Sequence, residues 1–154
     1  MKKIVSVAGL MLTQAIDKLD KEKFLTPMFV GYKDGSKEIK KRINDISLEQ
    51  SIPKVVSIYE ENSEDVEYAS IIFPAEFEEN GKRISVIIVM AQSYKTNEYI
   101  TISLPYSIKN GKICAKEYEL LDYSPFLLES LPELEKSFVD GLLSYGDAKE
   151  IWGR

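Results

Sequence analysis

The sequence predicts an α+β protein built on a largely antiparallel sheet of about six strands, with helices covering the sheet. The first observation is a row of four apolar stretches between residues 66 and 123, separated by short polar gaps. The second is that two gaps contain Asn80-Gly81 and Asn110-Gly111, pairs typical of two-residue hairpin turns because both positions require φ > 0. The third is helical spacing of apolar residues towards both ends of the chain. Together these observations predict the order α-β-β-α-β-β-β-β-α.

The chain is predicted to begin with an amphipathic helix over about residues 5–21. Apolar residues recur there at three- and four-residue spacing, as on the buried side of a surface helix. An alternative for this segment is a short secretory signal, with a positive start at Lys2-Lys3, an apolar run, and a small-residue cleavage site at residues 13–15. We favour the helix because the apolar spacing continues beyond that site, through Ile16 and Leu19.

Residues 24–43 are predicted to form a hairpin with its turn at Asp34-Gly35. The first strand should begin near Met28 or lie at a sheet edge, because Pro27 cannot donate a hydrogen bond to a neighbouring strand. The second strand contains a basic run, which we interpret as protection of a sheet edge rather than as a phosphate-binding site. Alternation divides its residues into two sides, with Glu38, Lys40 and Arg42 on one and Ile39, Lys41 and Ile43 on the other.

A helix is predicted over about residues 48–62, with two alternative starts. Ser47 and Gln50 have the spacing of a capping box, but this start leaves Pro53 well inside the helix. Ser51 as N-cap would instead place Pro53 in the first turn, where its missing N–H costs little. Either start gives an apolar stripe along one side of the helix.

The four central strands, residues 68–73, 84–90, 99–104 and 113–120, are predicted to form a meander, because short loops join antiparallel neighbours. The second of them is apolar on both sides, which is typical of a central strand covered on both faces. The third alternates between apolar and polar residues and should have one wetter face. The fourth contains Lys116, Glu117 and Glu119 and is therefore predicted to lie nearer an edge.

A last helix is predicted over about residues 131–144. Ser130 and Glu133 have capping-box spacing, and a proline in the first turn is tolerated. Gly141 is expected to weaken this helix by about 1 kcal/mol relative to alanine. The short tail contains the only tryptophan, Trp152, which should pack back on the molecule or take part in an interface.

The composition excludes several kinds of site. The chain has no histidine, so histidine-based catalytic triads are excluded and the commonest transition-metal ligand is missing. The single cysteine, Cys114, lies in an apolar strand and is interpreted as a buried, inert thiol. No glycine-rich phosphate loop occurs. The net charge of −5 disfavours nucleic-acid binding, and no apolar run is long enough to span a membrane.

We therefore expect a single cytoplasmic domain, residues 1–154, with no catalytic, cofactor or metal residues assigned. Pairs of carboxylates are the one alternative that would make the protein an enzyme. The candidates lie on predicted strands or turns and are Asp34, Glu76, Glu78, Glu79, Glu117, Glu119 and Asp122. In a chain with 25 acidic residues, solvated surfaces explain these positions better.

The candidate interaction surface comes from the aromatic residues. Tyrosine is common in strands for packing reasons, and it is also enriched at protein interfaces. Tyr99, Thr101 and Ser103 lie on one side of the third central strand, near acidic residues, and this face is a candidate for binding a basic partner. Trp152 is a separate candidate for an interface in the tail.

Several short stretches together resemble small uncharacterised bacterial α+β proteins. They are Pro27-Met-Phe-Val30, Asp34-Gly35 before a charged strand that ends at Arg42, a helix that ends in Glu60-Glu-Asn62, and Val89-Met-Ala-Gln-Ser-Tyr94. The resemblance covers about residues 24–94, and it implies the same succession of elements and a bacterial source. It implies no activity, cofactor or site residue.

The leading functional hypothesis is a non-catalytic protein-interaction or regulatory module, for example an immunity-like protein, because the chain is acidic and has no catalytic set. The alternative is a small-molecule-binding domain with a pocket between helix and sheet. A carboxylate-dependent enzyme is the third hypothesis. Self-association through an exposed edge strand or the Trp152 tail competes with all three.

Overall fold

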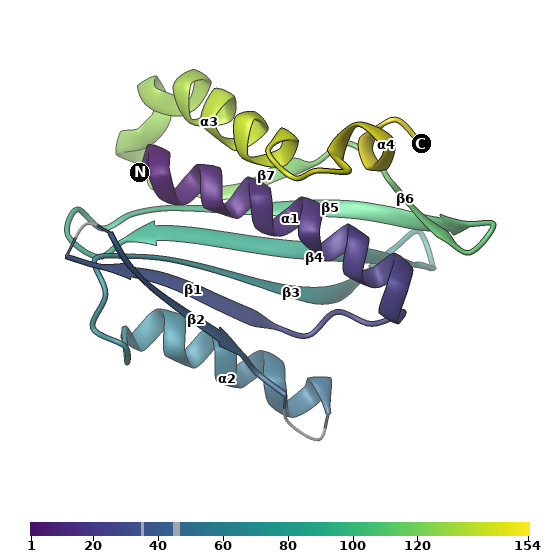
Figure 1. Cartoon of the computed structure of the whole chain (residues 1–154), viewed down its shortest axis with the longest axis horizontal. Helices are drawn as coiled ribbons and strands as arrows, with labels where there is room; N and C mark the ends of the chain where they lie inside the picture. The colour runs from purple at the N-terminus through teal and green to yellow at the C-terminus, as the bar shows by residue number, and fades with distance from the viewer. Residues whose placement is uncertain (35, 45–46) are drawn as a thin grey trace.

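The computed structural model describes residues 1–34, 36–44 and 47–154, and it shows an open antiparallel sheet with helices on both faces (Figure 1). The helices are α1 (Lys2–Glu22), α2 (Leu48–Glu61), α3 (Leu131–Leu143) and α4 (Ala148–Trp152), and a 3₁₀ helix, η1 (Pro125–Ser130), precedes α3. The strands are β1 (Met28–Lys33), β2 (Lys37–Arg42), β3 (Tyr68–Glu79), β4 (Lys82–Ser93), β5 (Glu98–Lys109), β6 (Lys112–Ala115) and β7 (Glu119–Tyr123). The α+β class and the largely antiparallel sheet predicted from the sequence are confirmed.

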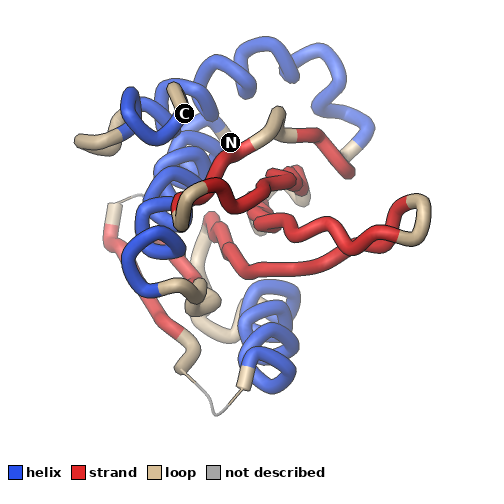
Figure 2. The backbone as a smooth tube through the Cα atoms, turned by 90° about the vertical axis from the view of Figure 1, so that its right-hand side faces the viewer, coloured by secondary structure: helices blue, strands red, loops and turns tan. Residues whose placement is uncertain are grey.

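The strands follow the order β2-β1-β3-β4-β5-β6, and β7 also pairs with β5. Every neighbouring pair is antiparallel. Strand β4 lies in the interior and β2 forms one edge, as the sequence predicted, while β6 and β7 share the other edge. Figure 2 shows α2 on one side of the sheet and the other helices on the opposite side. Among the described residues, none of the helices has both the length and the apolar character that crossing a membrane requires.

Helix α1 forms the centre of the larger core. It is one continuous helix through residues 13–15, and its buried side includes Ile4, Leu12 and Ile16, which are fully shielded from solvent. These side chains pack with sheet residues such as Ile87 and Leu104, so the predicted apolar spacing corresponds to the buried face. A smaller core on the other side joins α2 to β1 and β3.

Helices α1 and α3 approach each other very closely. A side chain on Gly9 would meet the Phe138 backbone oxygen at 2.2 Å, and one on Gly141 would meet the Ser6 oxygen at 1.9 Å. Thr13 Oγ1 donates a hydrogen bond to the Leu142 carbonyl at 2.7 Å across this contact. The glycine expected to weaken α3 is therefore what allows the two helices to touch.

The fourth central strand differs from the prediction. Its residues form two separate strands, β6 and β7, which pair with different parts of β5. The chain leaves the pairing between them because Tyr118 packs against Phe138 of α3, with ring centroids 5.0 Å apart. A predicted single strand over residues 113–120 is therefore wrong in its continuity.

The structure also shows where helix α2 begins and where the first strand of the hairpin lies. Helix α2 begins after Ser47, so the start at Ser51 is wrong, and Pro53 lies inside the helix. The side chain of Ser47 makes no capping hydrogen bond. Strand β1 begins at Met28, directly after Pro27, and it lies between β2 and β3 rather than at an edge. Gly35 of the predicted turn, and Asp45 and Ile46, lie outside the described residues.

The boundary of α3 agrees with the prediction, but what flanks it does not. Helix α3 begins at Leu131, with Ser130 as its N-cap residue, and the Ser130 side chain makes no capping hydrogen bond. The 3₁₀ helix η1 before it and the short helix α4 after it were not predicted.

Candidate functional site

Strand β7 is an edge strand whose side chains are largely exposed. It pairs with β5 on one side, and no strand pairs with its other side in the described part of the chain. Leu120 is 42% exposed and Leu121 is 47% exposed, although both lie within a strand. Large apolar side chains on an unpaired strand edge are the features that favour pairing with another chain.

The position of β7 is fixed at both ends. Lys116 still donates its backbone N–H to the Pro105 carbonyl at 2.9 Å, and the chain then leaves the sheet before β7 returns to it. At the other end, the Tyr99 N–H donates to Ser124 Oγ at 3.0 Å, and the Ser124 N–H donates to the Tyr99 carbonyl at 3.0 Å. Pro125 then begins η1, so the sheet ends at this point.

An apolar pocket lies beside β7, between β5, α1 and α3. Its volume is about 160 Å³. The residues that line it are Val5, Ile100, Ile102, Tyr118, Leu120, Leu131, Leu134, Glu135 and Phe138. Most of them belong to the main core, so the pocket is a place where the core is open to the surface.

Tyr118 and Glu135 give this pocket its polar groups. The Tyr118 hydroxyl donates a hydrogen bond to Glu135 Oε1 at 3.2 Å. Burial, and then the negative charge of Glu135, raise the pKa of Tyr118. Glu117 lines an adjoining hollow with the same two residues. The pocket therefore has apolar walls and an acidic rim.

The exposed apolar surface continues beyond the strand. Phe126 and Leu128 of η1 are 63% and 61% exposed. We define the β7 surface as these two residues together with the exposed leucines, the pocket rim and the acidic residues of β7. Its members are Glu117, Tyr118, Glu119, Leu120, Leu121, Asp122, Phe126, Leu128 and Glu135.

The β7 surface belongs to a strongly acidic part of the chain. Between residues 117 and 135 the sequence contains no lysine or arginine. The acidic residues in this stretch are Glu117, Glu119, Asp122, Glu129, Glu133 and Glu135. One of them, Glu133, is paired at 3.2 Å with Lys2, but both side chains are mostly exposed, so the pair is weak.

The two sides of β7 differ in chemistry. Leu120 lies opposite Ile102, which faces the pocket. Asp122 lies opposite Thr101 and Glu119 lies opposite Ser103, on the other side of the sheet. Leu121 is the extra residue at an irregularity in the pairing. The edge therefore presents an apolar side towards α3 and an acidic side away from it.

The structure separates the four residues predicted as an interaction surface. Tyr99, Thr101 and Ser103 share the side of β5 that faces away from α1, and Asp122 and Glu119 flank them as the sequence suggested. Ser103 is 1% exposed, and Tyr99 and Thr101 are half-buried, so little of them is accessible. Trp152 lies elsewhere, because its Nε1 donates to Thr13 Oγ1 of α1 at 2.9 Å.

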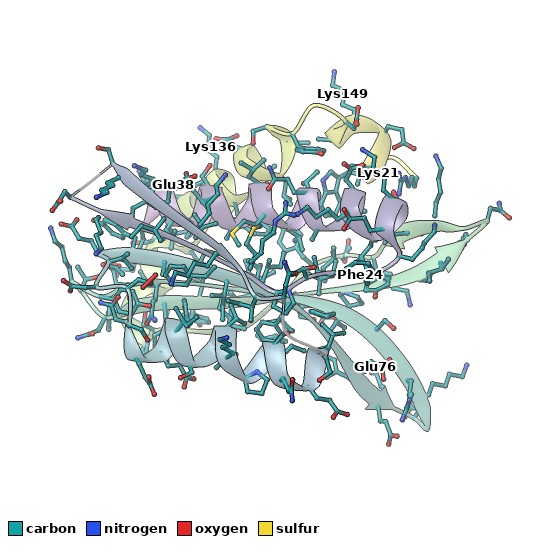
Figure 3. All side chains as sticks on the ribbon, turned by 60° about the horizontal axis from the view of Figure 1, so that its bottom comes forward. Lys21, Phe24, Glu38, Glu76, Lys136 and Lys149 are labelled. Carbon is teal, nitrogen blue, oxygen red and sulfur yellow. The ribbon has the colours of Figure 1, made fainter. Side chains whose placement is uncertain are left out.

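The predicted carboxylate candidates are dispersed. Glu76 lies towards the outer end of the β3–β4 hairpin (Figure 3), whereas Glu119 and Asp122 lie in β7 at one edge of the sheet. Outside these candidates, hydrogen bonds from Tyr32 and then Lys40 lower the pKa of Glu38, which is the opposite of what a general acid needs. Among the residues that the structure describes, no three acidic or cysteine side chains are grouped as metal ligands would be.

The sequence carried a partial signal for the β7 surface. It identified an edge strand with Glu117 and Glu119, and it noted Asp122 as an acidic residue. It gave no reason to expect exposed leucines, because exposure depends on which neighbours the fold supplies. The alternative of a pocket between helix and sheet named no lining residues, since α1 is far from β5, β7 and α3 in the chain.

Comparison of the chain with protein-family models, curated proteins and solved structures found no match. The β7 surface is therefore interpreted from its own geometry and chemistry.

Proposed function

We propose that this protein is a protein-interaction module that binds an extended, basic segment of a partner protein by adding it as a strand to β7. The observation that carries this proposal is the exposed apolar edge of β7 within an acidic surface. Strand addition is a common mode of peptide recognition, in which backbone hydrogen bonds supply affinity and alternate side chains supply specificity.

The two sides of β7 define the sequence pattern of the partner. Side chains of an added strand alternate between the two faces of the sheet. One set would lie near Leu120 and the apolar pocket, and the other set would lie near Glu119 and Asp122. A segment that alternates apolar residues with lysine or arginine satisfies both sides, because its charges complement the acidic stretch.

The pocket gives the partner an anchor point. Its volume of about 160 Å³ is close to that of cavities that hold a single benzene-sized group. One leucine, isoleucine or phenylalanine side chain would fill it, and a basic neighbour would reach Glu135 at the rim. Such a buried anchor with a polar surround is typical of the residues that dominate binding energy.

The proposal is tested with defined peptides. Random ten-residue peptides are selected by display against the full chain, and the selected sequences are then measured by fluorescence anisotropy. We expect alternating apolar and basic residues, and binding that weakens as the salt concentration rises. The substitution Leu121→Lys should weaken binding at least about tenfold, because it places a cation against the basic segment.

Leu143→Lys is the matched control, because Leu143 is 55% exposed at the far end of α3. It should leave the affinity unchanged, and both variants should unfold like the parent because exposed substitutions change stability by less than about 0.5 kcal/mol. Selected peptides that are acidic or lack alternation would overturn the proposal. Equal affinities for Leu121→Lys and Leu143→Lys would also overturn it. So would a dimer of the chain, formed through β7 and detected by sedimentation velocity.

Binding of a small apolar ligand in the same pocket is the second candidate function. The observation that favours it is a wall of core side chains with a hydroxyl and a carboxylate at the rim, the usual composition of a ligand pocket. An NMR titration with toluene and with phenol tests this candidate. We expect shifts at Val5, Ile102 and Leu134 that Leu121→Lys leaves intact and Leu134→Phe abolishes. Shifts confined to other residues would exclude it.

A further inference from the structure

A basic pocket lies at the opposite edge of the sheet from β7. It is formed between α1 and β2, and its volume is about 420 Å³. The residues that line it are Gln14, Lys18, Met28, Lys40, Arg42 and Tyr145. They come from α1, β1, β2 and the turn after α3, so only the folded chain brings them together. Among the residues that the structure describes, this lining contains three cations and no carboxylate.

Two acidic groups beside this pocket, Glu38 and Asp17, already have partners. Glu38 accepts a hydrogen bond from the Tyr32 hydroxyl at 2.7 Å, and it lies 3.2 Å from Lys40 Nζ. Asp17 accepts from the Tyr145 hydroxyl at 2.6 Å and pairs with Lys21 at 3.0 Å. These two carboxylates are therefore held by groups other than Lys18 and Arg42.

Lys18 and Arg42 have no matching anion among the described residues. Within residues 1–34, 36–44 and 47–154, neither forms an ion pair with a carboxylate. Partial burial, and then repulsion from Arg42 and Lys40, lower the pKa of Lys18, and Glu22 opposes this shift. Cations that repel one another across a hollow gain most from an anion placed between them.

We propose that this pocket binds a phosphoryl group, with Arg42 and Lys18 as its main ligands and Lys40 and Gln14 as further donors. Arginine offers a planar fork that matches two phosphate oxygens, and lysine adds a compact positive charge. The volume lies in the range of small-molecule sites and exceeds what one phosphate fills. Met28 and Tyr145 would face the remainder of a phosphorylated small molecule.

The basic run of β2 thus has a second role besides edge protection. Alternation along the strand places Lys40 and Arg42 on the α1 side, together with Glu38. Lys41 points to the other side, where its Nζ lies 2.5 Å from Glu64. Lys40 and Arg42 therefore contribute to the pocket, and Lys41 does not.

An NMR titration of the full chain tests the proposal, with inorganic phosphate, glucose 6-phosphate and glucose added separately at constant ionic strength. We expect both phosphates to shift the amides of Gln14, Lys18 and Arg42, and glucose to leave them unchanged. Tighter binding of glucose 6-phosphate assigns the site to phosphorylated small molecules, whereas equal binding assigns it to free phosphate. Shifts that centre on other residues, or no saturable binding, would overturn the proposal.

Two substitutions and one matched control complete the test. Arg42→Gln and Lys18→Gln should each weaken phosphate binding at least about tenfold, because each removes a charge-assisted hydrogen bond. Lys41→Gln removes the same charge one position away and should change affinity less than about twofold. Equal effects of Arg42→Gln and Lys41→Gln would mean that phosphate affinity depends only on the net charge of the protein, and would overturn the proposed site. Leu121→Lys should leave phosphate binding intact, because the site is independent of the function proposed for β7.

Discussion

The two edges of the sheet expose similar backbone but present opposite side chains. Strand β2 has the sequence KEIKKR, and its only apolar residue, Ile39, is half-buried. Strand β7 has the sequence ELLDY, and both of its leucines are exposed. One edge is therefore basic and highly charged, and the other is acidic and apolar.

The difference shows that an exposed edge is not by itself a binding site. A strand added to β2 would have to bring its own side chains against hydrated lysine and arginine groups, which disfavours pairing. A strand added to β7 would cover Leu120 and Leu121 and remove apolar surface from water. Side-chain chemistry, rather than backbone exposure, distinguishes the protected edge from the proposed binding edge.

The largest expected effect comes from Gly141→Ala, which should damage the β7 edge. The added carbon would lie 1.9 Å from the Ser6 oxygen, so α3 must move away from α1. Better helix propensity would gain about 1 kcal/mol, but overpacking against backbone costs about 3 kcal/mol or more, so the loss prevails. Urea denaturation should show a net destabilisation of about 2 kcal/mol, with peptide binding at β7 lost.

Gly146→Ala is the matched control, because its added carbon meets nothing within 4 Å. Its stability should change by less than about 0.5 kcal/mol. If Gly141→Ala were as stable as this control, the close packing of α1 on α3 would not be what shapes the β7 pocket.

The positions of most elements could be predicted because their signals are local. Apolar spacing predicted α1 and α3, and Asn80-Gly81 and Asn110-Gly111 predicted two hairpins, where both glycines have positive φ. The break between β6 and β7 could not be predicted, because it depends on Tyr118 meeting Phe138 from another part of the chain. Local sequence signals therefore indicate that an element forms, whereas packing against distant residues can determine where it ends.

Neither candidate site could be predicted in full, for the same reason. The sequence showed the basic run of β2 but could not show that Lys18 of α1 joins it. It showed Glu119 and Asp122 but could not show that Leu121 is exposed between them. Each site depends on contacts between residues that are widely separated in the chain.

Asp20→Ala tests whether β6 and β7, which both pair with β5 at the second edge, are held in place independently. Asp20 Oδ1 accepts a hydrogen bond from the Ile113 N–H of β6 at 2.7 Å. Its Oδ2 lies 2.5 Å from Arg154 Nη1 as an ion pair, although the two atoms are not aligned as a hydrogen bond. Loss of both interactions should cost about 2 kcal/mol in urea denaturation, because Ile113 and Arg154 lose a charged partner.

Asp20→Asn should cost less than Asp20→Ala, because an amide oxygen can still accept from Ile113. Glu22→Ala is the control, since Glu22 is exposed on the same helix. Hydrogen exchange should show faster opening of β6 in Asp20→Ala and an unchanged β7. Equal acceleration in both strands would mean that the two parts of this edge open together.

Removing charge from β2 should make the two edges more alike. The double substitution Lys37→Thr/Lys41→Thr leaves the basic pocket intact and takes two ammonium groups from the edge. We expect self-association to strengthen roughly fivefold, about 1 kcal/mol, measured by sedimentation velocity at several concentrations. Lys136→Thr/Lys149→Thr, on helices α3 and α4 (Figure 3), removes the same charge away from both edges and should have no effect. Equal association of both variants would show that β2 is not protected by its charges.

The smallest effect is expected for Tyr145→Phe, beside the basic pocket at the β2 edge. The Tyr145 hydroxyl is the main cause that lowers the pKa of Asp17, and the same hydrogen bond raises the pKa of Tyr145. A lowered carboxyl pKa stabilises the fold above about pH 4, and this contribution is lost as the pH falls through the lowered folded value. A raised tyrosine pKa adds stability that is present below about pH 10 and is lost as the pH rises further.

Tyr145→Phe should therefore reduce stability by about 1 kcal/mol or less near pH 7, and the difference from the parent should shrink below about pH 4. Urea denaturation from pH 3 to pH 8 measures this difference directly. Tyr123→Phe, which removes a hydroxyl at the β7 edge, should give a small difference that does not vary with pH. If Tyr145→Phe behaved in the same way, the lowered pKa of Asp17 would have to come from Lys21 instead, because Lys21 is the other group that holds this carboxylate at 3.0 Å.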